Sequence, residues 1–192
     1  MSHDTVKQNK ERQILSHYDE IWLFGYGSLI YKVDFPVLDS QPASIKGWKR
    51  RFWQGSHDHR GTPEKPGRVA TLIEADGEQC FGMAYQVTEE EFEHLDHREK
   101  NGYLRFEVDI NFTDSNPLQS KKGLVYIAPT DNEAFLGAAS ELEIAQHICQ
   151  SAGPSGDNSE YVYLLAKALR ALGVDDPHLY SIEGYLNELE AS

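Results

Sequence analysis

Cysteine is scarce in this chain. Its 192 residues include 2 Cys, Cys80 and Cys149, and neither belongs to a CxxC pair. The sequence therefore supports neither a disulfide framework nor a zinc ribbon, and a reducing cytoplasm is the expected compartment. No apolar run approaches the roughly 20 residues that span a bilayer. The first 20 residues are polar and lack the hydrophobic segment of a signal peptide, so no membrane partner is expected.

Positive charge is also in short supply. The chain has 18 Lys+Arg against 31 Asp+Glu and a formal net charge of −13, and an acidic surface repels nucleic acid phosphates and anionic lipid. Residues 50–61 interleave basic and aromatic side chains, which superficially suggests base stacking. The net charge favours a strand end and loop that feed a pocket, with Arg51 or Arg60 available to hold a carboxylate. Neither a nucleic acid partner nor an obligate protein partner is expected.

The rest of the composition is typical of a globular protein, with 40% hydrophobic residues, enough for one core at this length. Residues 1–20 have little periodicity and are expected to form a flexible N-terminal arm. Residues 21–192 are expected to form a single domain, since no repeat and no linker divides them. Short apolar runs predict strands at residues 21–26, 45–53, 68–73, 79–87, 103–112 and 123–128.

Helices interrupt and follow these strands. Thr88 with Glu91 fits a capping box, and Ser140 with Glu143 repeats the pattern. A further apolar helix face follows, and Asp176-Pro177 is a typical start for the last helix. Because most strands precede most helices, the order favours a compact α+β domain around a largely antiparallel, barrel-like sheet.

The turn Phe24-Gly25-Tyr26-Gly27-Ser28-Leu29 is the first candidate for a binding element. Its glycines allow positive φ angles and a close approach to a ligand, so the turn could cradle an anion. It is not a P-loop, because no GK[ST] follows, and it is not a nucleophile elbow, because Ser28 is followed by Leu29. The alternative is a tight turn that only ends the strand.

Glu99 is the most informative single residue. If the preceding helix extends this far, Glu99 lies seven residues beyond Phe92, on the face that points into the core. Charged side chains are rarely buried unless they are paired or functional. Glu99 is therefore a candidate for chemistry, and the alternative is a salt bridge to Arg98, Lys100 or a distant arginine. Glu90 fits an ordinary acidic helix start.

Several other polar residues have ordinary explanations. Residues 57–59 supply two histidines and an aspartate, and His94 and His97 form a second set, but each has too few ligands to predict a metal site. Cys149 falls on the apolar side of its helix, which favours a core thiol. Tyr161 begins a helical stripe and either belongs to the core or aims its hydroxyl into a pocket.

Four segments, taken together in their order and spacing, identify a protein family more specifically than any one of them does alone. They resemble the ChaC family of glutathione-specific γ-glutamylcyclotransferases, over residues 21–189, through FGYGSLIYKVDFP, RRFWQGSHDHRGTPEKPGRVATL, REKNGY and AGPSGDNSEY. Tyr31 stands where a Trp is usual, and His97 and Asn101 stand where Phe and Gly are common. The resemblance implies a γ-glutamylcyclotransferase-like α+β fold, a mixed, largely antiparallel β-barrel with flanking helices.

The resemblance also implies an activity. Glutathione is cleaved to 5-oxoproline and L-cysteinylglycine, the reaction of a carbon–nitrogen lyase that needs neither a metal nor a redox cofactor. By motif, Glu99 would be the catalytic carboxylate and Glu90 would help to select glutathione from a mobile segment. Tyr161 would lie near the pocket, and Arg51 is a less certain substrate contact. The residues that would bind the γ-glutamyl head are Tyr26, Gly27, Ser28 and Leu29.

The chemistry can be rebuilt from these parts. The α-amine and the γ-amide carbonyl belong to the same glutamyl residue, so attack closes a five-membered ring without an enzyme nucleophile. Glu99 would take a proton from the amine and return it to the leaving nitrogen, a role that favours a pKa raised by burial. Backbone N–H groups of the glycine turn would hold either the substrate α-carboxylate or the developing oxyanion.

Two alternatives remain open at the level of sequence. One keeps the cyclotransferase fold and shifts the substrate to other γ-glutamyl amines or dipeptides. The other is a non-catalytic regulator of cation transport, an association that the family name carries. Retention of Glu99 and of the intact glycine turn argues against a dead pocket.

Overall fold

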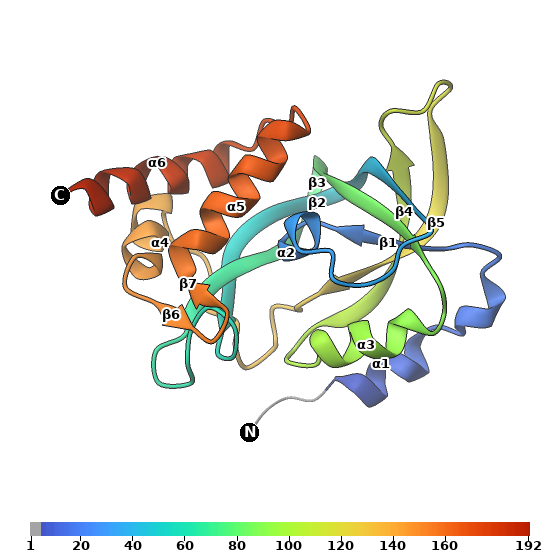
Figure 1. Cartoon of the computed structure of the whole chain (residues 1–192), viewed down its shortest axis with the longest axis horizontal. Coiled ribbons are helices and arrows are strands. Elements are labelled where there is room, and N and C mark those ends of the chain that lie inside the picture. Colours follow the sequence, from blue (N-terminus) through green and yellow to red (C-terminus); the bar gives the residue numbers. More distant parts are fainter. Residues whose placement is uncertain (1–4) are drawn as a thin grey trace. The chain divides into compact units, whose positions relative to one another are not determined.

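The structure, a computed structural model, describes residues 5–192, and these divide into two compact units (Figure 1). The first unit comprises the described chain up to Lys49 together with Glu74–Glu133. The second comprises Arg50–Ile73 and Ala134–Ser192. The single domain expected over residues 21–192 stays a prediction.

Five strands close into a barrel in the order β1-β3-β2-β4-β5. β1 pairs antiparallel with β3, β4 pairs antiparallel with both β2 and β5, and β1 runs parallel to β5. The mixed, largely antiparallel barrel with flanking helices that the sequence predicted is thereby confirmed. The strands are β1 (Ile21–Gly25), β2 (Asp39–Ser56), β3 (Gly67–Val87), β4 (Leu104–Phe112) and β5 (Gln119–Ile127).

The strand β3 corrects one prediction. The separate strands expected at residues 68–73 and 79–87 are parts of one strand of 21 residues. The residues that join them, 74–78, are exposed except for the half-buried Ala75, and they include Gly77 at φ 79°. A polar stretch with a glycine is typical of a turn. Here the hydrogen-bonded strand continues through it without burying side chains, so no hydrophobic pattern marks the continuation.

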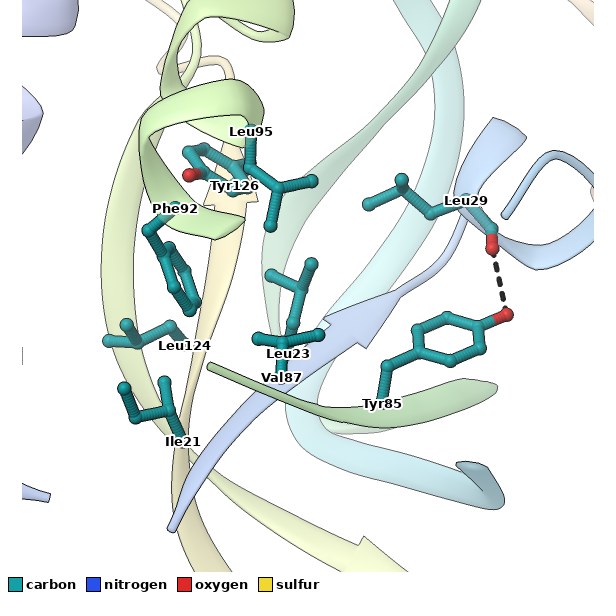
Figure 2. Close-up of a cluster of buried hydrophobic side chains, with 9 residues drawn as sticks. All are labelled: Ile21, Leu23, Leu29, Tyr85, Val87, Phe92, Leu95, Leu124 and Tyr126. Carbon is teal, nitrogen blue, oxygen red and sulfur yellow. Dashed lines mark hydrogen bonds between the residues drawn. The ribbon is translucent and has the colours of Figure 1, made fainter. Parts of the chain in front are cut away.

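The core of the first unit forms where α3 (Glu91–Arg98) packs on the barrel strands. Phe92 and Leu95 are each 1% exposed, and their spacing of three residues places both on one face of the helix. Figure 2 shows these two side chains pointing toward Leu23 and Leu124. Burying such side chains stabilises the unit by roughly 1.5–3 kcal/mol each.

The N-terminal segment contains more structure than the sequence indicated. It forms α1 (Val6–Arg12) and the short 3-10 helix η1 (Leu15–His17), and the side chains of Thr5 and Asn9 are 0% exposed. Both buried side chains are polar, so a search for apolar periodicity does not find this helix. The flexibility expected for residues 1–20 stays a prediction, and residues 1–4 lie outside the described part.

The second unit holds three helices that pack together, α4 (Glu141–Ile148), α5 (Asn158–Ala171) and α6 (Pro177–Ala191) (Figure 1). A two-stranded sheet of β6 (Ala152–Gly153) and β7 (Gly156–Asp157) precedes α5. The capping box predicted at the start of α4 is confirmed, because Ser140 Oγ accepts a hydrogen bond of 3.2 Å from the Glu143 N–H. The predicted start of α6 is confirmed as well.

Two local predictions were wrong. The capping box expected at Thr88 does not form, because α3 begins at Glu91 and residues 88–90 make a turn whose carbonyls accept backbone N–H groups three residues ahead. Cys149 is exposed and not a core thiol, because α4 ends at Ile148 and the cysteine lies at the C-cap.

No helix within residues 5–192 is both long enough and apolar enough to cross a lipid bilayer.

Candidate active site

The glycine turn connects β1 to the one-turn helix α2 (Ser28–Tyr31). Neither Gly25 nor Gly27 has the positive φ that the sequence suggested. Gly25 is needed for a different reason: a Cβ there would lie 3.0 Å from the Leu29 Cβ, closer than side chains normally approach. The absence of a side chain at Gly25 therefore lets α2 fold back against the end of β1.

Both sides of this turn are held by tyrosine hydroxyls. Tyr26 Oη donates a hydrogen bond of 2.6 Å to the carbonyl oxygen of Tyr126 on β5. Tyr85 Oη donates one of 2.7 Å to the carbonyl oxygen of Leu29 (Figure 2), and burial raises the pKa of Tyr85 to about 12. Because Tyr85 stays a neutral donor at physiological pH, these two hydrogen bonds fix the turn to the barrel.

Glu99 lies immediately after α3, at its C-cap, and not within the helix. Its N–H donates to the Leu95 carbonyl oxygen at 2.9 Å, which continues the helical hydrogen bonding by one residue. The side chain is 16% exposed, so the carboxylate is largely shielded yet still reaches solvent. A carboxylate that is largely shielded but still reaches solvent can exchange protons with a bound molecule.

Arg98 joins the glycine turn to Glu99. Its Nη2 donates to Ser28 Oγ at 3.3 Å, and its Nε lies 3.8 Å from Glu99 Oε1. Its Nη1 also donates to Asp34 Oδ1 at 2.6 Å, just after α2. One guanidinium therefore spans both elements that the sequence singled out. The sequence left Arg98, Lys100 or a distant arginine open as salt-bridge partners of Glu99, and it gave no sign of the contact between Arg98 and the turn.

The sequence also missed a buried network beside this site. Asp96 is 2% exposed, its Oδ1 accepts a hydrogen bond of 2.5 Å from Tyr126 Oη, and the Arg105 Nε lies 3.6 Å away. Burial raises the pKa of Asp96, opposed by the Tyr126 hydrogen bond and the Arg105 charge. Burial, followed by the Asp96 charge, raises the pKa of Tyr126 well above its usual range. The spacing of four residues between Phe92 and Asp96 was the signal that could have found this acid.

The remaining predicted residues are placed as follows. Glu90 is exposed and lies in the turn that leads into α3, within the first unit. Arg51 and Tyr161 belong to the second unit, on β2 and α5 respectively. Arg51 Nη1 donates to the Arg50 carbonyl oxygen at 2.6 Å. The first unit thus brings the glycine turn and Glu99 together and carries Glu90 at the opposite end of α3 from Glu99.

Tyr161 is 6% exposed, which agrees with a core position. Its hydroxyl oxygen accepts a hydrogen bond of 3.2 Å from the Ala70 N–H, and its ring meets Phe52 edge-on with centroids 5.8 Å apart. The other candidate for holding a carboxylate, Arg60, donates to Glu160 Oε2 at 2.7 Å. In this unit, therefore, Arg60 holds a carboxylate that belongs to the protein itself.

Within the described residues, no group of three His, Cys, Asp or Glu side chains converges as a metal site would require. His59 Nε2 lies 3.7 Å from Asp58 Oδ2, which makes a pair and not a ligand set. His94 and His97 are both exposed on α3. What the site offers is a carboxylate, a guanidinium, a hydroxyl and the backbone of a tight turn.

Comparison with known proteins gives a consistent result. The sequence pattern of the ChaC-like protein family matches residues 21–189. The glutathione-specific γ-glutamylcyclotransferase 1 of Danio rerio is 46% identical over 187 residues, which cover 92% of this chain and 94% of that protein. The glutathione-specific γ-glutamylcyclotransferase of Saccharomyces cerevisiae is 36% identical over 202 residues, which cover 80% of this chain and 87% of that protein.

Solved structures agree with this result. A crystal structure of the yeast γ-glutamyl cyclotransferase specific to glutathione superposes with a TM-score of 0.82 at 33% identity, and the match covers 89% of this chain and 97% of the yeast chain. A second structure, described as a γ-glutamyl cyclotransferase, superposes with a TM-score of 0.53 at 14% identity over 86% of this chain and 87% of its own, and it shares the fold alone.

Proposed function

The chain belongs to the ChaC-like family, and from that premise we propose that it is a glutathione-specific γ-glutamylcyclotransferase, a lyase that converts glutathione to 5-oxoproline and L-cysteinylglycine. The relatives that are 46% and 36% identical carry this specificity in their names. The observation that carries the proposal is the placement of Arg98 between Ser28 and Glu99. It supports one site built from two of the four segments on which the family resemblance rests, those that contain Ser28 and Glu99.

The chemistry asks little of the protein beyond positioning and proton transfer. The α-amine of the γ-glutamyl residue attacks the γ-carbonyl of the same residue, the carbonyl carbon becomes tetrahedral, and the bond to the cysteine nitrogen then breaks. Holding the chain in a ring-closing conformation supplies a large part of the rate, because both reacting groups are already in one molecule. No external nucleophile is consumed.

Glu99 supplies the proton transfer. In its ionised form it removes a proton from the α-ammonium group, and it then returns that proton to the leaving nitrogen, because an amide anion is a very poor leaving group. The second proton that the attacking nitrogen loses as the ring closes passes to the released amine, which leaves as an ammonium ion. Arg98 holds the carboxylate beside the glycine turn. The turn itself, Tyr26 to Leu29, binds the γ-glutamyl head. Its backbone N–H groups donate hydrogen bonds either to the α-carboxylate of the substrate or to the oxyanion that develops during attack.

Three further residues have proposed roles in selecting the substrate. Glu90 lies on the exposed turn before α3 and is suited to contact the amine end or the peptide backbone of glutathione. Arg51 offers a positive charge for a substrate carboxylate. A role for Tyr161, whose hydroxyl accepts a hydrogen bond from the Ala70 N–H, is proposed from the family resemblance alone.

The direct test compares wild-type protein with Glu99→Gln, which keeps the shape of the side chain and removes the base. Purified protein is incubated with glutathione, and 5-oxoproline and cysteinylglycine are quantified together. We expect equal amounts of both products from the wild type and a loss of about 100-fold or more in kcat for the variant. The matched control is Glu93→Gln on the same helix, whose side chain is 78% exposed and whose activity should stay at the wild-type level.

Two outcomes would contradict the proposal. Wild-type turnover that survives in Glu99→Gln would remove Glu99 from the reaction. A faster reaction with γ-glutamyl-alanine than with glutathione, measured in direct competition, would keep the cyclotransferase chemistry and transfer the specificity to other γ-glutamyl compounds.

A further inference from the structure

The helix α1 (Val6–Arg12) precedes residues 21–189, the part of the chain that the family pattern matches. Its contacts are made by polar side chains that face the segment after Glu99. Thr5, the N-cap residue of this helix, is 0% exposed although its side chain is polar. The buried polar side chains of Thr5 and Asn9 form hydrogen bonds with the backbone of residues 100–105.

Thr5 contacts the backbone of Glu99 and of the next residue. Its Oγ1 donates to the carbonyl oxygen of Lys100 at 2.9 Å and lies 3.4 Å from the carbonyl oxygen of Glu99. Its backbone N–H donates to the same Lys100 carbonyl at 2.9 Å. Two donors of one residue therefore converge on the carbonyl oxygen of the residue that follows the proposed catalytic Glu99.

Asn9 acts one helical turn further along α1. Its Nδ2 donates to the Tyr103 carbonyl oxygen at 3.1 Å, and its Oδ1 accepts from the Arg105 N–H at 2.8 Å. The amide side chain thus bonds the backbone as a neighbouring strand would, at the start of β4. It is 0% exposed, so its hydrogen bonds do not compete with water.

A short connection, residues 101–102, lies between these two anchors. Gly102 turns the chain at φ 96°, and the Tyr103 N–H donates to the Glu99 carbonyl oxygen at a long 3.3 Å. Glu99 is the first residue beyond α3, so the helix fixes it from one side only. On the other side, the hydrogen bonds of Thr5 and Asn9 fix the backbone that follows it.

We propose that Thr5 and Asn9 are positioning residues for the cyclotransferase reaction: by clamping residues 99–105 onto α1, they hold the Glu99 carboxylate in line with the substrate amine. This inference rests on the proposed role of Glu99. A displacement of a reacting group by about 1 Å can cost on the order of 100-fold in rate, so partial loosening of the clamp is expected to be measurable. Neither residue touches the substrate.

The test uses the full chain and three variants of α1 or its cap. Thr5→Val is nearly isosteric and removes the donor, Thr5→Ser restores it, and Gln8→Ala changes the exposed face of the same helix. We expect Thr5→Val to lower kcat for glutathione by about 10-fold with KM within about 2-fold. Thr5→Ser and Gln8→Ala should match the wild type. Equal kcat in Thr5→Val and wild type, with both folded, would overturn the proposal.

A second measurement separates this inference from the function on which it rests. Hydrogen exchange of the amides of residues 99–105 is expected to be about 10-fold faster in Thr5→Val and in Asn9→Leu than in Gln8→Ala, while exchange in β1 stays unchanged. This readout needs no turnover. If wild-type protein does not cleave glutathione, the proposed function fails, whereas unchanged exchange in both variants shows that α1 does not hold the segment and overturns the clamp itself.

Discussion

Arg98 contacts both an acidic side chain and the glycine turn. The sequence offered a salt bridge to Arg98 as the alternative to a functional Glu99. In the structure the two readings do not exclude each other, because the same guanidinium lies 3.8 Å from Glu99 and 3.3 Å from Ser28 Oγ. Its planar fork can point at several acceptors at once, which a lysine ammonium on a flexible stem cannot.

The first prediction follows from that difference. Arg98→Lys keeps the positive charge but cannot reach Ser28 and the acidic partners together, so we expect kcat/KM for glutathione to fall by about 10-fold. The matched control is Arg170→Lys, an exposed arginine that donates to Glu183 at 2.8 Å in the second unit. It should leave kcat/KM unchanged. A wild-type value in Arg98→Lys would show that charge alone suffices.

The sequence predicted that an acid lies on the core-facing side of α3, but not which acid is the most deeply buried. Helical periodicity identifies a face, and that face contains two acids, Asp96 and Glu99. It is Asp96, at 2% exposed, that lies deepest in the core, while Glu99 lies past the helix end. Periodicity cannot tell a buried structural acid from a half-shielded reactive one, because that depends on partners such as Tyr126 that are distant in the sequence.

At the scale of elements, two similar capping-box sequences form different structures at the starts of their helices. Ser140 with Glu143 forms a reciprocal capping box on α4, whereas Thr88 with Glu91 does not cap α3. The turn before α3 uses backbone carbonyls to accept the first helical N–H groups, so the threonine side chain is not needed there. A pattern of residue types does not reveal which of these two solutions the backbone adopts.

This contrast gives a matched pair of substitutions. Ser140→Ala removes a side-chain acceptor that is used, so we expect the free energy of unfolding to fall by about 1 kcal/mol. Thr88→Ala removes one that does not cap its helix, so the change should stay within about 0.5 kcal/mol. Urea denaturation of both variants beside the wild type measures the difference. Equal losses would mean that Thr88 caps α3 in solution.

Buried asparagines are the element-scale feature that sequence reasoning could not predict. Asn158 at the start of α5 accepts from the Arg68 N–H at 2.8 Å and donates to the Arg68 carbonyl at 2.8 Å, so it satisfies both polar groups of one strand residue. Asn9 in the first unit bonds the carbonyl of Tyr103, just before β4, and the N–H of Arg105 within it. Their partners lie about ninety residues away in the sequence, beyond the reach of local patterns.

At the scale of the whole chain, the net charge of −13 says little about stability, because most of the acids are solvated. Two buried groups, Asp96 and His178, have shifted pKa values and therefore contribute to the pH dependence of stability. Burial raises the pKa of Asp96 above its usual 3.8, so its stabilising contribution is present below that value and is lost as the pH rises through the folded-state pKa. His178 in the second unit responds in the opposite direction.

His178 is 5% exposed, and its Nε2 accepts a hydrogen bond of 3.1 Å from the Phe52 N–H. Burial, followed by the charge of Arg51, lowers the pKa of this imidazole below its usual 6.5, while Glu141 and Asp176 oppose that shift. The unfolded chain therefore binds the proton more readily than the folded one. The stability that neutral His178 contributes is fully present above pH 6.5 and is lost as the pH falls from there through the folded-state pKa.

We therefore expect wild-type protein to lose stability on acidification from about pH 7.5 to about pH 5.5, with a contribution from His178 that approaches about 1.4 kcal/mol per pH unit. His178→Gln, which keeps an acceptor for the Phe52 N–H and cannot titrate, should show a shallower slope in urea denaturation across this range. The exposed His94→Gln should keep the wild-type slope. An NMR titration of the folded wild type provides an independent check, because a His178 imidazole that protonates above pH 6.5 would reverse the sign of the effect.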